Sequence, residues 1–181
     1  MKTNKCLVIV DLQNDFVDGS LANSEGLRVV NSVAEYIKTF EGNIICTFDT
    51  HDDNYLSTFE GKNLPIKHCI KGTVGWELHP VITQAIQQWQ NMHEGCYTYS
   101  EVLKTTFGYP GWSNESSLKN IDEIHVCGLV TDICVISNVL GLKEHMPDVD
   151  IIVHGNLCAG LSREAHDAAL MVMKSCQVKV V

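Results

Sequence analysis

The sequence predicts an α/β fold: a three-layer α/β/α, doubly wound and mainly parallel sheet of five or six strands. Short β-branched apolar runs alternate with longer segments in which apolar residues recur every three or four positions. The apolar runs lack polar alternation, which is typical of parallel strands covered by helices on both faces. This alternation of strand and helix continues along the whole chain, as in open α/β sheets.

Five apolar runs are predicted to be strands, and one further segment is a weaker candidate. Each run is rich in Val, Ile or other residues that favour strands. The five runs are Cys6–Val10, Asn43–Phe48, Ile124–Leu129, Val149–His154 and Val178–Val181. The weaker sixth candidate is Cys96–Tyr99, which is shorter and more polar.

Helices are predicted between these strands from the spacing of apolar residues. The predicted segments are Leu27–Phe40, Leu78–Met92, a helix from Thr131 or Asp132 to Glu144, and Arg163–Cys176. Ser162 is a suitable N-cap for the last helix. The stretch His51–Gly75 shows neither period and is predicted to be a long loop, a kind of segment that is often functional.

Length and charge restrict the class of protein. The chain has 181 residues, with 13 Lys and Arg against 22 Asp and Glu, which gives a formal charge of −9. This length predicts a single domain spanning residues 1–181. The acidic balance without a basic cluster argues against nucleic acid or an anionic membrane as a partner. No apolar run approaches the roughly 18 residues of a membrane span.

The cysteines and the N-terminus indicate a cytoplasmic protein. The chain has eight cysteines, none of them in a Cys-x-x-Cys pair, so a zinc-finger or zinc-ribbon site is excluded. A chain of this length does not need a disulfide scaffold. Asp11 interrupts the first apolar run, so no signal peptide is expected.

Chemically useful side chains follow several predicted strands, at the point where each strand ends. Asp11 follows the first strand, Asp49 and His51 follow the second, Lys104 follows the weaker candidate, and Cys134 follows the Ile124–Leu129 run. Ligands of open α/β sheets bind beyond the carboxyl ends of the strands. These side chains are therefore expected to meet at one edge of the sheet.

Cys134 is a candidate nucleophile because it lies where a strand passes into a helix. Backbone N–H groups, the helix dipole and Lys104 would all favour its thiolate. Asp11 could take the thiol proton and return it to a leaving amine. The alternatives are an inert buried cysteine, an aspartate that caps a loop, and a solvated lysine.

A second candidate site is a metal centre. Asp49 and His51 lie two residues apart on an extended segment, His68 comes from the far end of the loop, and Glu60 from its middle. Two histidines with one or two carboxylates suit Zn, Fe or Mn. The alternative is a set of unrelated polar loop residues.

These residues lie in short motifs that resemble one enzyme family. The motifs occur in order along the chain: Asp11–Phe16 (DLQNDF), Gly19–Leu21, Asp49–His51 (DTH), His68–Cys69, Lys104 followed by Phe107, and Gly128–Val135 (GLVTDICV). In this order they resemble the isochorismatase-like cysteine hydrolases, and the metal set resembles the nicotinamidase branch.

The resemblance implies a specific activity. It implies a catalytic triad of Cys134, Asp11 and Lys104, and a thioester intermediate in the hydrolysis of nicotinamide to nicotinate and ammonia, a step of NAD salvage and pyridine nucleotide biosynthesis. It also implies one divalent metal, most often Zn, with Fe or Mn as alternatives, that orients the pyridine nitrogen. The ligands implied are Asp49, His51 and His68.

The resemblance implies further site residues. Glu60 is the candidate fourth ligand, and Phe16 the candidate wall for the substrate ring. The backbone amides of Val130 and Cys134 would bind the oxyanion, and a non-proline cis peptide is expected at Val130–Thr131.

Other readings remain open from the sequence. Leu64–Lys67 lacks the aromatic residue that often precedes the last histidine ligand in this branch, so ring stacking is expected from Phe107 or Tyr109 instead. The same triad could hydrolyse another small amide or ureide. The fold could also serve as a non-catalytic module that binds small molecules. A homo-oligomer is compatible with all of these readings.

Overall fold

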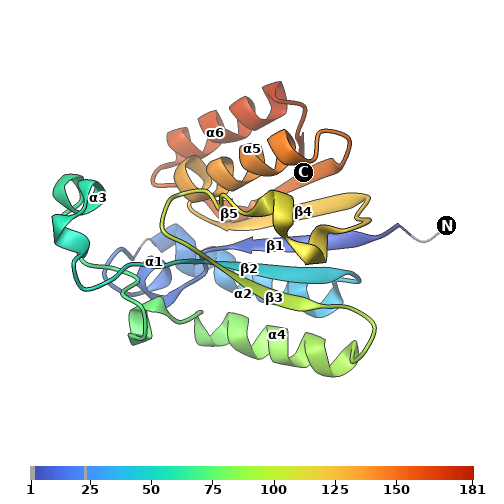
Figure 1. Ribbon diagram of the computed structural model, residues 1–181, viewed down its shortest axis with the longest axis horizontal. Coiled ribbons are helices and arrows are strands. Elements are labelled where there is room, and N and C mark those ends of the chain that lie inside the picture. Colours follow the sequence, from blue (N-terminus) through green and yellow to red (C-terminus); the bar gives the residue numbers. More distant parts are fainter. Residues whose placement is uncertain (1–2, 23) are drawn as a thin grey trace.

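The fold is built on one parallel sheet. The computed structural model describes residues 3–22 and 24–181. Its six strands lie in the order β3-β2-β1-β4-β5-β6, and all neighbouring strands pair in parallel (Figure 1). The strands are β1 (Lys5–Val10), β2 (Asn43–Asp49), β3 (Tyr99–Lys104), β4 (Glu123–Leu129), β5 (Asp150–Ala159) and β6 (Lys179–Val180).

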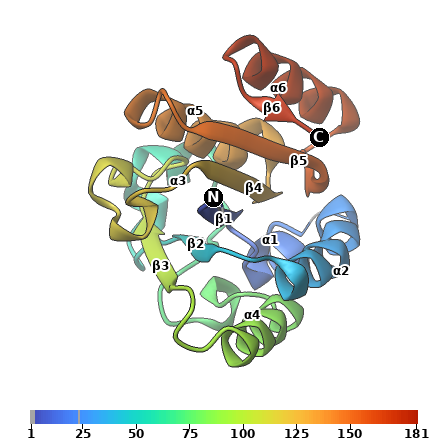
Figure 2. The ribbon, with the colours of Figure 1, turned by 90° about the vertical axis from the view of Figure 1, so that its right-hand side faces the viewer.

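Helices cover both faces of the sheet. Helices α2 and α4 pack together on one face, whereas α5 and α6 pack on the other (Figure 2). The helices are α1 (Asn14–Val17), α2 (Ser24–Thr39), α3 (Phe59–Asn63), α4 (Pro80–Met92), α5 (Ile136–His145) and α6 (Arg163–Ser175). Among the described residues, no helix is long and apolar enough to cross a membrane. The three-layer architecture predicted from the sequence is confirmed.

The central strands are buried on both sides, as their composition predicts. Residues Cys6–Val10 of β1 are inaccessible to solvent, and the same holds for most of β4. Burial of these β-branched side chains between two helical layers supplies the main apolar contribution to stability. The five stronger strand predictions are therefore confirmed in place, with ends that differ by a few residues.

The sixth strand is present, but its predicted position at Cys96–Tyr99 is wrong. Strand β3 begins at Tyr99 and ends at Lys104, and it pairs with β2 from Ile44 to Asp49. Because β3 lies at the edge of the sheet, alternate side chains such as Glu101 and Leu103 are exposed. An edge strand of this kind does not need a continuous apolar run, so the sequence pattern there is weak.

Several helix boundaries are set by local capping. The helix predicted from Leu78 begins instead at Pro80, because His79 Nδ1 accepts a hydrogen bond from the Val81 amide at 3.3 Å. Proline at the first helical position needs no hydrogen-bond acceptor for its nitrogen. Ser162 caps α6 as predicted, and its hydroxyl accepts a 3.1 Å hydrogen bond from the Ala165 amide.

The long loop is more structured than its sequence indicates. It contains the single turn Tyr55–Ser57, helix α3 and the turn Val74–Trp76, and α3 extends away from the sheet (Figure 1). The helix predicted from Thr131 begins with a π-helical turn at Thr131–Val135 before α5. Short elements of this length lack enough periodicity to be predicted.

Gly128 allows β1 and β4 to pair closely just before both strands reach their carboxyl ends. It pairs with Val10 in β1 and has a φ of 125°. A Cβ at this position would lie 2.1 Å from the carbonyl oxygen of Val10. Val10 directly precedes Asp11, so this close approach also positions the predicted site.

We predict that Gly128→Ala lowers the free energy of unfolding by about 3 kcal/mol or more, because it combines a backbone clash with a disfavoured φ. Gly72→Ala is the matched control, since Gly72 has a φ of 83° but no atom within 4 Å of an added Cβ. The control should lose only about 1–2 kcal/mol. Urea unfolding measures both, and equal losses would show that the clash with Val10 is unimportant.

Candidate active site

The residues predicted from the strand ends meet at the carboxyl edge of the sheet. Asp11 follows β1, Asp49 ends β2 and Lys104 ends β3. Asp49 and Lys104 are directly paired across β2 and β3. Cys134 lies in the π-helical turn that follows β4. Because all four strands run in the same direction, their carboxyl ends place these side chains together.

Lys104 is the centre of this group. Its Nζ atom lies 2.6 Å from Asp11 Oδ2, 3.3 Å from Asp49 Oδ1 and 3.8 Å from Cys134 Sγ. The lysine is only 1% exposed, and Asp11 is fully buried. A buried ammonium is costly unless it is paired, and two carboxylates here offset that cost.

Thr47 holds Asp11 in place. The Thr47 hydroxyl donates to Asp11 Oδ1 at 2.6 Å, and Thr47 Oγ1 accepts a hydrogen bond from the Asp11 amide at 3.2 Å. Asp11 itself has a φ of 49°, in the left-handed region that few residues other than glycine adopt. Thr47 is a residue that the sequence analysis missed, because a threonine inside an apolar strand carries no functional signal.

The protonation of the site follows from burial and from the lysine charge. Burial raises the pKa of Asp11, although the Lys104 ammonium opposes that rise. Burial alone would lower the pKa of Lys104, but the charges of Asp11, Cys134 and Asp49 outweigh it and raise that pKa. Lys104 is therefore a permanent cation, and Asp11 is a stronger base than an exposed aspartate.

Burial opposes the thiolate form of Cys134 that the helix dipole and Lys104 favour. Burial raises the pKa of the Cys134 thiol well above its ordinary value of 9.0, and the negative charge of Asp11 raises it further. Lys104 lowers it, but not by enough to compensate. Desolvation of the thiol, which local sequence does not reveal, is the largest of these effects.

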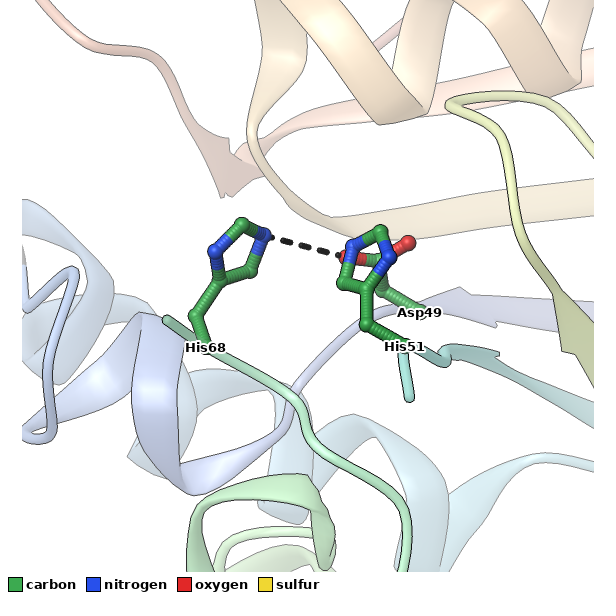
Figure 3. A group of neighbouring side chains, drawn as sticks. All are labelled: Asp49, His51 and His68. Carbon is green, nitrogen blue, oxygen red and sulfur yellow. Dashed lines mark hydrogen bonds and ion pairs between the residues drawn. The ribbon is translucent and has the colours of Figure 1, made fainter. Parts of the chain in front are cut away.

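The predicted metal ligands also come together. Asp49 Oδ2 lies 3.0 Å from His51 Nε2 and 3.4 Å from His68 Nε2, and both imidazoles point toward the carboxylate (Figure 3). The donor atoms of these three buried residues all lie within 4.8 Å of one another. Glu60 approaches the same group, with Oε1 3.7 Å from each histidine Nε2. This group could bind a divalent metal.

The surroundings of this group fit a cation. The carbonyl oxygen of Ile66 lies 2.9 Å from His68 Nδ1 and accepts its proton, which in the neutral imidazole leaves the lone pair of Nε2 for a metal ion. Burial would raise the pKa of Asp49, but hydrogen bonds from His51 and His68 and the Lys104 charge lower it. The carboxylate is thus ionised, as a metal ligand must be.

Gln13 positions Asp49 and was not singled out from the sequence. Its side-chain amide donates to the carbonyl oxygen of Asp49 at 2.9 Å and to that of Trp76 at 2.7 Å. Its Oε1 atom accepts a hydrogen bond from the Asp49 amide at 2.8 Å. One buried glutamine therefore ties the end of β2 to the segment after β1 and to the long loop.

Asn138 performs a similar role next to Cys134. Its Nδ2 atom donates to the Cys134 carbonyl at 2.8 Å and to the Phe107 carbonyl at 3.1 Å. Its Oδ1 atom accepts from the Tyr109 amide at 2.8 Å. This side chain links the nucleophile turn to the segment after β3, a link that helical spacing could not reveal.

The turn before Cys134 corrects one expectation. The cis peptide lies at Leu129–Val130, not at Val130–Thr131. The carbonyl oxygen of Val130 instead accepts hydrogen bonds from the amides of Ile133 at 3.2 Å and Val135 at 3.0 Å. The Val130–Thr131 peptide therefore already belongs to the first helical turn.

The candidate ring-binding residues lie in different places. The Phe16 ring is 5.6 Å from the ring of His68, so it borders the metal group. Phe107 lines an open, largely apolar cavity of about 830 Å³ that also contacts His51, Glu60 and Ile133. Tyr109 packs instead edge-on against Trp112, with ring centroids 5.0 Å apart.

Known proteins with similar sequences include several named as nicotinamidases. A nicotinamidase/pyrazinamidase of Mycobacterium tuberculosis is 29% identical over 188 residues, which cover 98% of this chain and 98% of that protein. A nicotinamidase of Escherichia coli is also 29% identical, over 94% of this chain and 90% of that protein.

Solved structures share the fold. The nicotinamidase of Bacillus subtilis superposes with a TM-score of 0.78 at 27% identity, covering 99% of both chains. The pyrazinamidase of Pyrococcus horikoshii, solved in complex with zinc, has a TM-score of 0.77 at 24% identity over 98% of both chains. The family model of the isochorismatase domain matches residues 5–181. The chain therefore belongs to the isochorismatase family.

Proposed function

We propose that this protein is a metal-dependent nicotinamidase that hydrolyses nicotinamide to nicotinate and ammonia. The observation that carries the proposal is the position of Lys104 Nζ, 2.6 Å from Asp11, 3.3 Å from Asp49 and 3.8 Å from Cys134. One buried cation thereby joins a base, a thiol and a metal group. The relatives named nicotinamidase support the choice of substrate.

In the first half of the reaction Cys134 acts as nucleophile. Asp11 takes the thiol proton as Sγ bonds to the carboxamide carbon, and the carbonyl oxygen becomes an oxyanion. The backbone amides of Val130 and Cys134 are proposed to donate to that oxygen. The C–N bond then breaks, Asp11 returns its proton to the departing ammonia, and a thioester remains.

In the second half water replaces the thiol. Asp11 takes a proton from water as the water oxygen bonds to the thioester carbon. Collapse of this second tetrahedral intermediate breaks the C–S bond, returns a proton to Cys134 and releases nicotinate. Lys104 keeps Asp11 ionised between proton transfers, and the raised pKa that burial gives Asp11 makes it a better proton acceptor.

Asp49, His51 and His68 are the proposed metal ligands, and Glu60 is a fourth. Two imidazoles and carboxylates suit Zn best, with Fe or Mn as alternatives. A bound ion would hold the pyridine nitrogen and thereby orient the carboxamide toward Cys134. Phe16, whose ring borders His68, is the proposed wall for the substrate ring.

The cavity beside the metal group favours a second candidate function, hydrolysis of a larger aromatic amide by the same triad. Its apolar lining includes Phe59, Leu64, Phe107 and Ile133, and its volume is about 830 Å³. Burial of an apolar substituent there would add to binding. Ammonia release from nicotinamide, pyrazinamide and an alkyl-substituted nicotinamide, compared by kcat/KM, distinguishes the two functions.

We predict that Cys134→Ala lowers kcat/KM for nicotinamide by at least about 1000-fold, because no other group can form the thioester. Cys96→Ser is the control, since Cys96 is exposed, and it should retain wild-type ammonia release. Normal turnover by Cys134→Ala would contradict the mechanism.

We predict that chelation lowers nicotinamide hydrolysis at least about tenfold, and that added Zn restores it. Asp49→Asn should hold less metal after dialysis and show the same loss of nicotinamide hydrolysis. Asp53→Asn is the control, because the Asp53 side chain is 97% exposed. Full activity of a protein shown by elemental analysis to be metal-free would remove the metal from the proposal.

We predict that iodoacetamide alkylates Cys134 faster as the pH rises, without a plateau below about pH 9, because burial raises the pKa of its thiol. Lys104→Met removes the charge that lowers this pKa, so alkylation at pH 8 should slow by about tenfold. Lys67→Met, at an exposed ion pair, is the control. Peptide mass spectrometry measures the rates, and a plateau near neutral pH would show a stable thiolate instead.

A further inference from the structure

A second group of metal-binding side chains lies away from the candidate active site. Tyr36 is in the last turn of α2, His125 is near the start of β4, and His154 is in β5. His125 pairs with Ile152, so His154, two residues further along β5, faces the same side of the sheet. That side is covered by α2, which brings Tyr36 onto both histidines.

Three donor atoms of this group form a nearly equilateral triangle. Tyr36 Oη lies 3.1 Å from His125 Nδ1 and 3.1 Å from His154 Nε2, and the two nitrogens are 2.9 Å apart. A tetrahedral zinc with bonds of about 2.0 Å holds its ligands roughly 3.3 Å apart. The spacing is close to that of the Asp49 group, where the carboxylate lies 3.0 and 3.4 Å from the histidine nitrogens.

The outer neighbours of His125 orient it as a ligand. Its Nε2 atom lies 3.3 Å from Glu123 Oε2, which accepts the ring proton there and leaves the lone pair of Nδ1 directed at the triangle. Lys5 Nζ lies 3.5 Å from the same carboxylate oxygen. A carboxylate that fixes the far nitrogen of a histidine is a regular feature of metal sites.

Hydrogen bonding does not fully account for the triangle. With His125 Nδ1 unprotonated, the triangle contains only two protons, one on the Tyr36 hydroxyl and one on the His154 ring. Two protons cannot form linear hydrogen bonds along all three short distances. A cation at the centre of the triangle would satisfy all three donors at once.

The group can be reached from solvent. Tyr36 and His125 line an open cavity of about 420 Å³, which offers room for an ion and a water ligand. Lys5 and Glu41 line it as well, so the opening carries both signs of charge. The ring of Phe40 packs edge-on against His125, with centroids 5.4 Å apart, and restricts rotation of the imidazole.

We propose that Tyr36, His125 and His154 form a second site for a divalent transition metal of the zinc and copper class, which clamps α2 to β4 and β5. The two imidazole nitrogens are the principal ligands, and the Tyr36 oxygen and water complete the coordination. Zinc binds such mixed nitrogen and oxygen ligands. This site does not depend on the proposed amidase function, and its loss would leave the candidate active site intact.

The test is a zinc count on the full-length protein. After metal removal, the protein is equilibrated with Zn²⁺ at pH 7.5, dialysed and analysed for zinc. The wild type should hold one zinc equivalent at this site. His154→Gln should lose that equivalent, whereas His51→Gln should retain it. His145→Gln, at an exposed histidine, is the matched control and should bind as wild type. His154→Gln should keep wild-type ammonia release, which separates this site from the proposed function.

Tyr36→Phe retains the packing of the ring and serves as a second variant. It should lower the zinc affinity of this second site by about tenfold or more. Zn²⁺ should also raise the Tm of His51→Gln but not that of the double variant His51→Gln and His154→Gln. The proposal is overturned if His154→Gln binds as much zinc as wild type, or if Tyr36→Phe leaves the affinity unchanged.

Discussion

The buried ammonium of Lys104 is the interaction on which the candidate active site depends. It lies 2.6 Å from Asp11 and 3.3 Å from Asp49, so it neutralises two carboxylates that would otherwise repel each other in a region without solvent. Removing one partner of such a buried pair leaves an uncompensated charge, which costs several kcal/mol. The thiol of Cys134 and Asp49 of the metal group therefore share one cation as a neighbour, and each charge influences the other.

The parallel sheet explains why these groups can be brought together at all. Each strand ends at the same edge, and the residues that follow point into a common space. Side chains with no predicted chemical role hold the strand ends in place: Thr47 binds Asp11, Gln13 binds the backbone of Asp49, and Asn138 binds the carbonyl of Cys134. These three buried amides and hydroxyls convert a general property of the fold into a specific geometry.

The opposite part of the same sheet shows how similar physics can produce a different cluster. Burial lowers the pKa values of His125 and His154, whereas His68 has a raised pKa because hydrogen bonds to Asp49 and Ile66 outweigh its burial. Both clusters place donor atoms about 3 Å apart. They differ in that one is built around a carboxylate and the other around a phenol.

The sequence by itself determined the fold class and most of the candidate site. Apolar periodicity distinguishes strands from helices locally, and in a parallel sheet the residue after each strand is directed to one edge, which is why Asp11, Asp49, His51 and Cys134 could be named without coordinates. The tertiary structure alone decided the rest. The edge strand β3 has too little apolar pattern to be located, and supporting residues such as Thr47 and Gln13 act through partners 36 positions away. The protonation of Cys134 and the meeting of Tyr36 with His125 and His154 depend on burial and on neighbours distant in the chain, and local sequence carries no record of either.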